Sequence, residues 1–222
     1  MKNAVIFDLD NTLYDQEEFI ISAAKEISNF LKKKYGVASY KLLMEIFNSK
    51  TPMYPHTFDD LVKKLGLKVN IDKLVKIFHS HKGRMKMYKN TKPVLKKLRK
   101  YFTLYLVTDG NVAMQRNKVK ILGLEDFFDK IIYARKYGES YEKPSNKLYR
   151  NLVKNENIDI KKSFFVADNP HIDFIKIKEL GIKTIRIRRG IYRRFFLDES
   201  HEADYCVEDI QDCVKHILIK NF

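Results

Sequence analysis

The stretch AVIFDLDNTLY, residues 4–14, runs four apolar residues directly into two aspartates, Asp8 and Asp10. A short continuous apolar run is typical of a strand buried on both faces, as in parallel sheets. Ligands of such sheets bind beyond the carboxyl ends of the strands, where both aspartates would lie. Two neighbouring carboxylates repel each other, so the pair invites a cation. The alternative is an acidic turn, because Asp and Asn are common turn residues.

The composition is that of an ordinary globular chain, with 222 residues, 45% of them apolar, and few glycines and prolines. A net charge of +15 favours anionic partners without choosing among phosphorylated metabolites, nucleic acid and acidic membranes. Cys206 and Cys213 are expected to be reduced thiols. No signal peptide and no apolar stretch of membrane-spanning length is found, so we expect a cytoplasmic protein without a membrane partner.

Residues 15–87 have helical periodicity and are expected to form a small all-helical domain inserted after the first strand. Apolar residues recur at helical spacing in four segments, residues 19–31, 42–47, 58–65 and 71–78. Gly66 is expected to end the third helix, and Thr51–Pro55 to interrupt the helical pattern.

Residues 1–14 and 88–222 are expected to form an α/β core with a Rossmann-like parallel sheet, because strands there alternate with helices. The expected strands after the first are residues 104–107, 131–133, 164–167 and 182–187. The expected helices are residues 93–100, 112–122, 144–153, 170–181 and 209–219. Pro144 and Pro170 would open two of these helices, since Pro suits the first helical position.

Polar residues follow the buried strands of this core. Thr108 and Asp109 follow the second strand, Asp168 follows the fourth, and Lys143 precedes Pro144. Because parallel strands gather their carboxyl ends at one edge of a sheet, these groups are expected to meet Asp8 and Asp10 there. Carboxylates suit Mg²⁺, and a hydroxyl with a lysine suits a phosphate. A carboxylate can also act as a nucleophile, and a second one beside it can move the proton.

These elements, in this order, resemble the haloacid dehalogenase superfamily of phosphotransferases. Asp8 to Thr12, DLDNT, matches the family pattern DxDxT, and Thr108 matches its Ser or Thr after the second core strand. Lys143 matches the family lysine, and Asp168 to Asp173 matches a pair of acids with four residues between them. The resemblance covers nearly the whole chain, and it implies that residues 15–87 are the family's cap domain.

The resemblance implies catalytic roles for the matching residues. Asp8 would be the nucleophile that takes the phosphoryl group, and Asp10 the general acid and base. Thr108 and Lys143, with Asp109 beside them, would bind the phosphoryl oxygens of the substrate.

It also implies a Mg²⁺ site, held by Asp8, Asp168 and the backbone carbonyl of Asp10. Thr12 would hold the motif loop, and Asp173 would support the metal site or Lys143. Like unit charges about 4 Å apart repel by roughly 4 kcal/mol at an effective dielectric near 20, so several acids and a phosphate need such cations.

Two residues depart from the family pattern. Ala167 stands where a glycine is usual, and its methyl group could crowd the metal site. Asp109 replaces the asparagine that often follows the hydroxyl residue, and an added acid there would alter substrate preference.

The densest basic run is Arg186–Arg194. Alternation of Ile and Arg at its start predicts a half-exposed strand with a solvated edge. The alternative is a nucleic-acid patch of clustered arginines with nearby aromatic residues. His79 and His81 are expected on the surface of the helical domain, and His171 in an exposed first turn.

We therefore expect a Mg²⁺-dependent phosphomonoesterase that hydrolyses a small phosphorylated metabolite, a sugar phosphate or a nucleotide, through an aspartyl-phosphate. A sugar phosphomutase would share all four motifs. A second alternative is a nucleic-acid-binding protein or polynucleotide-end phosphatase that uses the basic surface. The substrate and the oligomeric state are not specified by the sequence.

Overall fold

The computed structural model of this chain describes residues 1–49 and 55–219, and every structural statement below concerns those residues. The expected interruption at Thr51–Pro55 lies outside them, except for Pro55. The strands are β1 (Ala4–Phe7), β2 (Thr103–Thr108), β3 (Lys130–Tyr133), β4 (Phe164–Ala167), β5 (Lys183–Ile187) and β6 (Tyr205–Val207).

The described strands form one parallel sheet in the order β3-β2-β1-β4-β5-β6. β1 lies between β2 and β4, with Ile6 in register with Tyr105 on one side and Phe165 on the other. The order reverses between β1 and β4, and such a switch point opens a crevice at the carboxyl ends of the strands. The expected Rossmann-like sheet is therefore confirmed. It places Asp8 and Asp168 directly after β1 and β4, and Thr108 at the end of β2.

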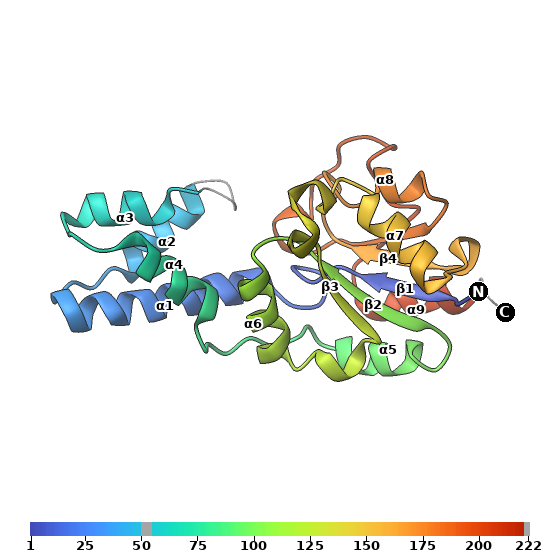
Figure 1. Cartoon of the computed structure of the whole chain (residues 1–222), viewed down its shortest axis with the longest axis horizontal. Coiled ribbons are helices and arrows are strands. Elements are labelled where there is room, and N and C mark those ends of the chain that lie inside the picture. Colours follow the sequence, from blue (N-terminus) through green and yellow to red (C-terminus); the bar gives the residue numbers. More distant parts are fainter. Residues whose placement is uncertain (50–54, 220–222) are drawn as a thin grey trace.

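Helices cover both faces of this sheet (Figure 1). The core helices are α5 (Thr91–Leu98), α6 (Val112–Leu122), α7 (Lys147–Glu156), α8 (Ile175–Lys178) and α9 (Ile210–Ile219). The 3-10 helices are η1 (Glu125–Phe127), η2 (Ala134–Tyr137), η3 (Glu139–Tyr141), η4 (Ile160–Lys162) and η5 (Gly190–Tyr192).

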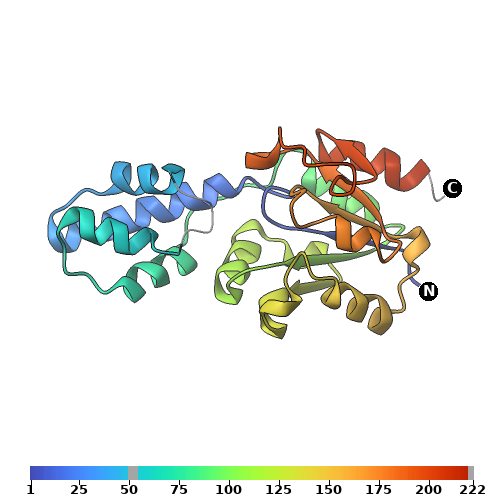
Figure 2. The ribbon, with the colours of Figure 1, turned by 90° about the horizontal axis from the view of Figure 1, so that it is seen from above.

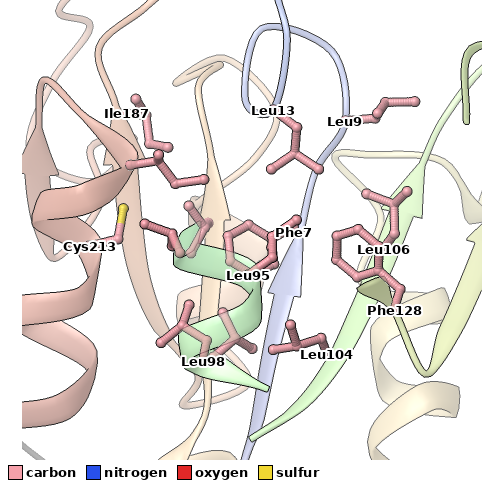
Figure 3. Close-up of a cluster of buried hydrophobic side chains, with 14 of the residues drawn as sticks. Phe7, Leu9, Leu13, Leu95, Leu98, Leu104, Leu106, Phe128, Ile187 and Cys213 are labelled. Atoms are coloured by element: carbon pink, nitrogen blue, oxygen red, sulfur yellow. The ribbon is translucent and has the colours of Figure 1, made fainter. Parts of the chain in front are cut away.

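Alternate residues of β1 enter two different apolar clusters, because successive side chains of a strand point to opposite faces. Val5 and Phe7 pack with residues of α5, α6 and α9, and Figure 3 shows Phe7 among the leucines of this cluster. Ala4 and Ile6 pack with residues of α7 and α8. Burial on both faces explains why β1 is apolar without alternation, and it fixes the direction in which the chain leaves the strand at Asp8.

Four helices between β1 and α5 form a separate group beyond one end of the sheet, as Figures 1 and 2 both show. They are α1 (Gln16–Tyr35), α2 (Tyr40–Ser49), α3 (Thr57–Leu65) and α4 (Ile71–Ser80), and they share their own apolar cluster. The Asp15 side chain caps α1 by accepting a hydrogen bond from the backbone N–H of Glu17. Gly66 ends α3 in the left-handed conformation, as predicted.

Two predicted helix starts are wrong. α7 begins at Lys147 rather than at Pro144, and its first N–H donates to the Ser145 hydroxyl at 3.3 Å. In place of a helix over residues 170–181, only α8 is α-helical. The Asp173 carboxylate accepts from the backbone N–H of Asn169 at 2.8 Å, and such side-chain bonds compete with helical ones.

β6 was not predicted, because it has three residues and only Val207 of them is buried. Two surface predictions are also wrong: β5 is not an edge strand, and His81 is buried, with its Nδ1 3.0 Å from the carbonyl oxygen of Phe78. His171 is exposed, as expected. Across the described ranges, no helix has both the length and the apolar character that crossing a bilayer requires.

Candidate active site

The carboxyl ends of β1, β2 and β4 border a cavity of about 380 Å³. The five residues predicted to converge, Asp8, Asp10, Thr108, Lys143 and Asp168, all line it. Asp8, Thr108 and Asp168 lie at the carboxyl ends of adjacent parallel strands, which accounts for their meeting, whereas Asp10 and Lys143 reach the cavity from loops. The spatial expectation drawn from the sequence therefore agrees with the geometry.

Asp8 lies at the centre of this group and is 6% exposed. Its backbone N–H continues the sheet by donating to the carbonyl of Val166 at 2.9 Å, which fixes the residue where the strand ends. Its Oδ1 lies 2.6 Å from Nζ of Lys143, and its Oδ2 accepts from the Thr12 hydroxyl at 3.4 Å. Thr12 therefore links the start and end of the motif loop, as expected.

Lys143 reaches the site from a loop and is held at two points. Its Nζ is 2.7 Å from Oδ1 of Asp173, so Asp173 supports the lysine. Its backbone N–H donates to Oδ2 of Asp109 at 2.9 Å. An asparagine at position 109 could accept the same bond through its oxygen, so the negative charge is what Asp109 adds.

The buried acids repel one another. Burial, reinforced by the nearby Asp173 and Asp10 and opposed by Lys143, raises the pKa of Asp8 to about 7. Burial followed by Asp173 and Asp8 raises the pKa of Asp168 well above its usual range. For Lys143, burial alone would lower the pKa, but the surrounding acids outweigh it and raise that pKa.

Asp10 has a different environment from Asp8. Its carboxylate accepts hydrogen bonds from Lys118 Nζ at 2.7 and 3.0 Å, from Gln115 Nε2 at 2.9 Å and from the Tyr14 hydroxyl. Burial on its own would raise the pKa of Asp10, but Lys118, Tyr14 and Gln115 outweigh it and lower that pKa. The pKa values of two aspartates one residue apart are thereby shifted in opposite directions by their surroundings.

The acids at the carboxyl ends of β1 and β4 suit a hard cation. Oδ2 of Asp168 is buried without a hydrogen-bond partner, and the mutual repulsion of Asp8 and Asp168 would fall if a cation lay between them. Over the described residues, no three His, Cys, Asp or Glu side chains form a complete metal cage. Mg²⁺ needs none, because it binds one or two carboxylates and keeps water and phosphate oxygens as its other ligands.

Comparison with known proteins agrees with this geometry. The model of the haloacid dehalogenase-like hydrolase family matches residues 5–187. The chain belongs to the haloacid dehalogenase-like hydrolase family. The family resemblance inferred from the four motifs is thus confirmed, as is the hydrolase class.

Two curated relatives and one solved structure of this family are similar over the whole chain. A glyceraldehyde 3-phosphate phosphatase of Pyrococcus abyssi is 30% identical over 100% of this chain and 96% of its own length. A glyceraldehyde 3-phosphate phosphatase of Methanocaldococcus jannaschii is 27% identical over 100% of this chain and 98% of its own length. The magnesium-bound HAD-hydrolase YfnB of Bacillus subtilis superposes with a TM-score of 0.73 at 16% identity, over 98% of this chain and 99% of that one.

In this haloacid dehalogenase-like hydrolase, Gln115 and Lys118 are site residues that sequence reasoning missed. Both are buried and lie on the same face of α6 as Val119 and Leu122. A lysine and a glutamine on the apolar stripe of an amphipathic helix would have been the available signal, because such residues are rarely buried without a partner.

Ala167 is buried in the apolar cluster that contains Ile6 and Phe165, and it is not among the residues that line the cavity. A methyl group at this position of the hydrolase therefore fills the core and leaves the cavity open.

Arg186 was expected at a solvated edge, and this expectation is wrong. It lies on β5 between β4 and β6 and has no exposed surface. Its guanidinium pairs with Glu202 and donates to the carbonyl of Asp168 at 3.2 Å and that of Tyr192 at 2.6 Å. This arginine therefore ties the segment after β5 to the loop that carries Asp168.

Proposed function

We propose that this hydrolase is a Mg²⁺-dependent phosphomonoesterase of small phosphorylated metabolites that works through an aspartyl-phosphate. The observation that carries the proposal is the Asp8 carboxylate, buried in the cavity and 2.6 Å from Lys143 Nζ, with Thr108 and Asp168 also at the cavity wall. The curated relatives named above are phosphatases of a three-carbon phosphate ester, which supports the same reaction class here.

In the first step, an oxygen of Asp8 would attack phosphorus, and the bond from phosphorus to the leaving oxygen would break. Lys143 and Thr108 would donate hydrogen bonds to the phosphoryl oxygens as charge accumulates on them. Asp10 would give its proton to the leaving oxygen. Asp109 would contribute by fixing the backbone of Lys143, because its carboxylate accepts a hydrogen bond from the Lys143 backbone N–H.

In the second step, water would attack phosphorus and Asp10 would take its proton, so that the bond to Asp8 breaks and phosphate leaves. Lys118, Gln115 and Tyr14 bind the Asp10 carboxylate in the conformation described above. That conformation supports the base role of the second step, whereas the acid role of the first requires Asp10 to turn away from Lys118.

The metal would be held by the carboxylates of Asp8 and Asp168 and the backbone carbonyl of Asp10. Mg²⁺ bound there would act as a Lewis acid toward a phosphoryl oxygen. The free Oδ2 of Asp168 supports its place in this set. Asp173 would support the set indirectly, through Lys143.

The helical residues 15–87 would serve as a cap domain over the core, residues 1–14 and 88–222. A cap that closes on the substrate excludes water that would otherwise compete with the leaving group. Gln16, the first residue of α1, lines the cavity and would be the cap's contribution to its wall. The unbridged thiols of Cys206 and Cys213 suit the reducing cytoplasm.

The test is substitution of Asp8 by asparagine, which keeps the shape and removes the nucleophile. Turnover of an aryl phosphate with Mg²⁺ should fall by on the order of 10⁴-fold or more. Asp59→Asn, on the exposed face of α3, is the matched control and should retain activity. Substantial phosphate release by Asp8→Asn would refute the assigned nucleophile.

A further inference from the structure

Acidic side chains outnumber basic ones in the wall of the cavity, whereas basic residues outnumber acidic ones in the whole chain. The chain carries a net charge of +15. Six acidic residues line the cavity, Asp8, Asp10, Asp109, Glu142, Asp168 and Asp173. Among its described lining residues, Arg135 and Lys143 are the two permanent cations. The basic composition therefore says little about the field that a bound substrate meets.

Both cations of the cavity already have partners. Lys143 Nζ lies 2.6 Å from Asp8 and 2.7 Å from Asp173. Arg135 donates through Nε to Glu142 at 2.8 Å and through a terminal nitrogen to Glu139 at 2.9 Å. Neither cation can bind a second anionic group of a substrate unless one of its present ion pairs with a carboxylate breaks.

Apart from His171, the remaining wall of the cavity consists of apolar and neutral polar residues. Met114, Ile172 and Ile191 supply apolar surface, and Asn11 and Gln16 supply amides. Such a mixture suits a carbon skeleton that bears hydroxyl or carbonyl groups, because apolar walls contact its carbons and amides bond its oxygens.

We infer that the leaving group of the substrate is an uncharged, oxygen-bearing carbon compound, and that the cavity discriminates against leaving groups with a carboxylate or a further phosphate. The inference rests on the proposed phosphatase function and narrows its substrate class. With Lys143 paired to Asp173 and Arg135 paired to Glu142, the cavity wall would offer an anionic leaving group no unpaired cation, and Asp109 would add a further acid beside it. Repulsion by an acid across a partly buried site amounts to about a tenfold change in rate constant or more.

Glu142 is the acid best suited to test this inference. Its side chain is 13% exposed, it accepts from the backbone N–H of Gly110, and the proposed chemistry does not use it. Glu139 is the matched control: it also pairs with Arg135, but it is 80% exposed and is not part of the cavity wall.

The experiment compares two pairs of esters, glycerol 3-phosphate with 3-phosphoglycerate, and phenyl phosphate with 4-carboxyphenyl phosphate. Within each pair the second ester adds one carboxylate to the leaving group. We expect kcat/KM of the Mg²⁺-loaded protein to be about tenfold higher for the neutral member, with the ratio falling as salt screens the charges. Glu142→Gln should narrow the ratio, whereas Glu139→Gln should leave it unchanged.

Each outcome has a distinct meaning. Equal kcat/KM within the pairs, or preference for the carboxylated ester, would overturn the inference while the phosphatase function stands. If Glu139→Gln narrowed the ratio of kcat/KM as much as Glu142→Gln does, the preference for neutral esters would depend on Arg135, and the inference would also be overturned. Failure to hydrolyse any of the four esters would count against the proposed function itself.

Discussion

At the residue scale, the two aspartates of the DLDNT motif differ in their partners: Asp8 contacts Lys143, and Asp10 contacts Lys118. Lys118 has no exposed surface, its Nζ lies 2.7 Å from Asp10, and it sits 4.7 Å from the ring centroid of Phe19 on α1. Without Lys118, burial would act to raise the pKa of Asp10, because desolvation disfavours the charged carboxylate. Lys118 therefore sets the charge of Asp10.

Replacing Lys118 by methionine should lower the free energy of unfolding by about 2 kcal/mol at pH 7, since a partly buried carboxylate loses its partner. The pKa of Asp10 is lowered in the folded state. The ion pair therefore stabilises the fold fully above the unfolded-state pKa of about 3.9, and this stabilisation is lost as the pH falls through the pKa of the folded state. The stability difference between the two proteins should therefore shrink below about pH 4.

Urea denaturation at a series of pH values measures this difference. Lys120→Met, on the same helix but exposed, is the control and should follow the wild-type curve. A constant gap between Lys118→Met and wild type from pH 7 to pH 3 would contradict the ion-pair explanation.

At the element scale, the segment after β5 is packed on the loop after β1. Gly190 has φ 59°, and a Cβ built on it would lie 2.5 Å from Cγ of Asn11. Asn11 lines the cavity next to Asp10. A side chain at position 190 would therefore displace the loop that follows Asp8.

Gly190→Ala should lower both stability and kcat/KM of aryl phosphate hydrolysis, the latter by about tenfold, because small displacements in an active site reduce rates strongly. Gly36→Ala is the matched control: its φ is 74°, and nothing lies within 4 Å of an added Cβ. The control should lose about 1 kcal/mol of stability through backbone strain alone and keep its activity. Equal kcat/KM in the two variants would show that the Asn11 contact does not matter.

Sequence reasoning found the elements with strong patterns and missed those that depend on tertiary contacts. β1 follows from an apolar run, and the helices α1 to α4 follow from helical periodicity. The start of α7 and the shortness of α8 depend on side-chain bonds of Ser145 and Asp173, which residue types alone do not reveal. Arg186 resembled a solvated residue because its partner Glu202 lies beyond the predicted strands.

The candidate site was easier to predict than its surroundings. A parallel sheet brings strand ends together whatever the loops do, so Asp8, Thr108 and Asp168 could be placed from their positions after strands. The network around Asp10 could not, because it requires knowing that α6 turns Gln115 and Lys118 toward the sheet.

At the scale of the whole molecule, the acids of the site tie stability to pH and metal. The pKa of Asp8 rises from 3.8 to about 7 on folding. The folded state therefore binds this proton more tightly, and stability of the metal-free protein should fall as pH rises from about 4 to about 7. Asp8→Asn should flatten this dependence.

Addition of Mg²⁺ should raise the unfolding temperature more at pH 8 than at pH 5, because protons compete with the metal for Asp8 and Asp168. Thermal unfolding with Mg²⁺ and with a chelator measures both effects. A Mg²⁺ shift that is independent of pH, or that persists in the Asp8→Asn protein at full size, would place the metal elsewhere.

The chain crosses twice between the sheet and the four-helix group, and the two crossings are joined. Tyr14 and Met87 form an antiparallel bridge, and the backbone N–H of Tyr88 donates to the carbonyl of Leu13 at 2.9 Å. Because the two connecting segments are hydrogen-bonded to each other, we expect the four-helix group to rotate relative to the sheet about a single hinge. The Tyr14 hydroxyl also donates a hydrogen bond to Asp10, so we expect such a rotation to displace the Asp10 carboxylate.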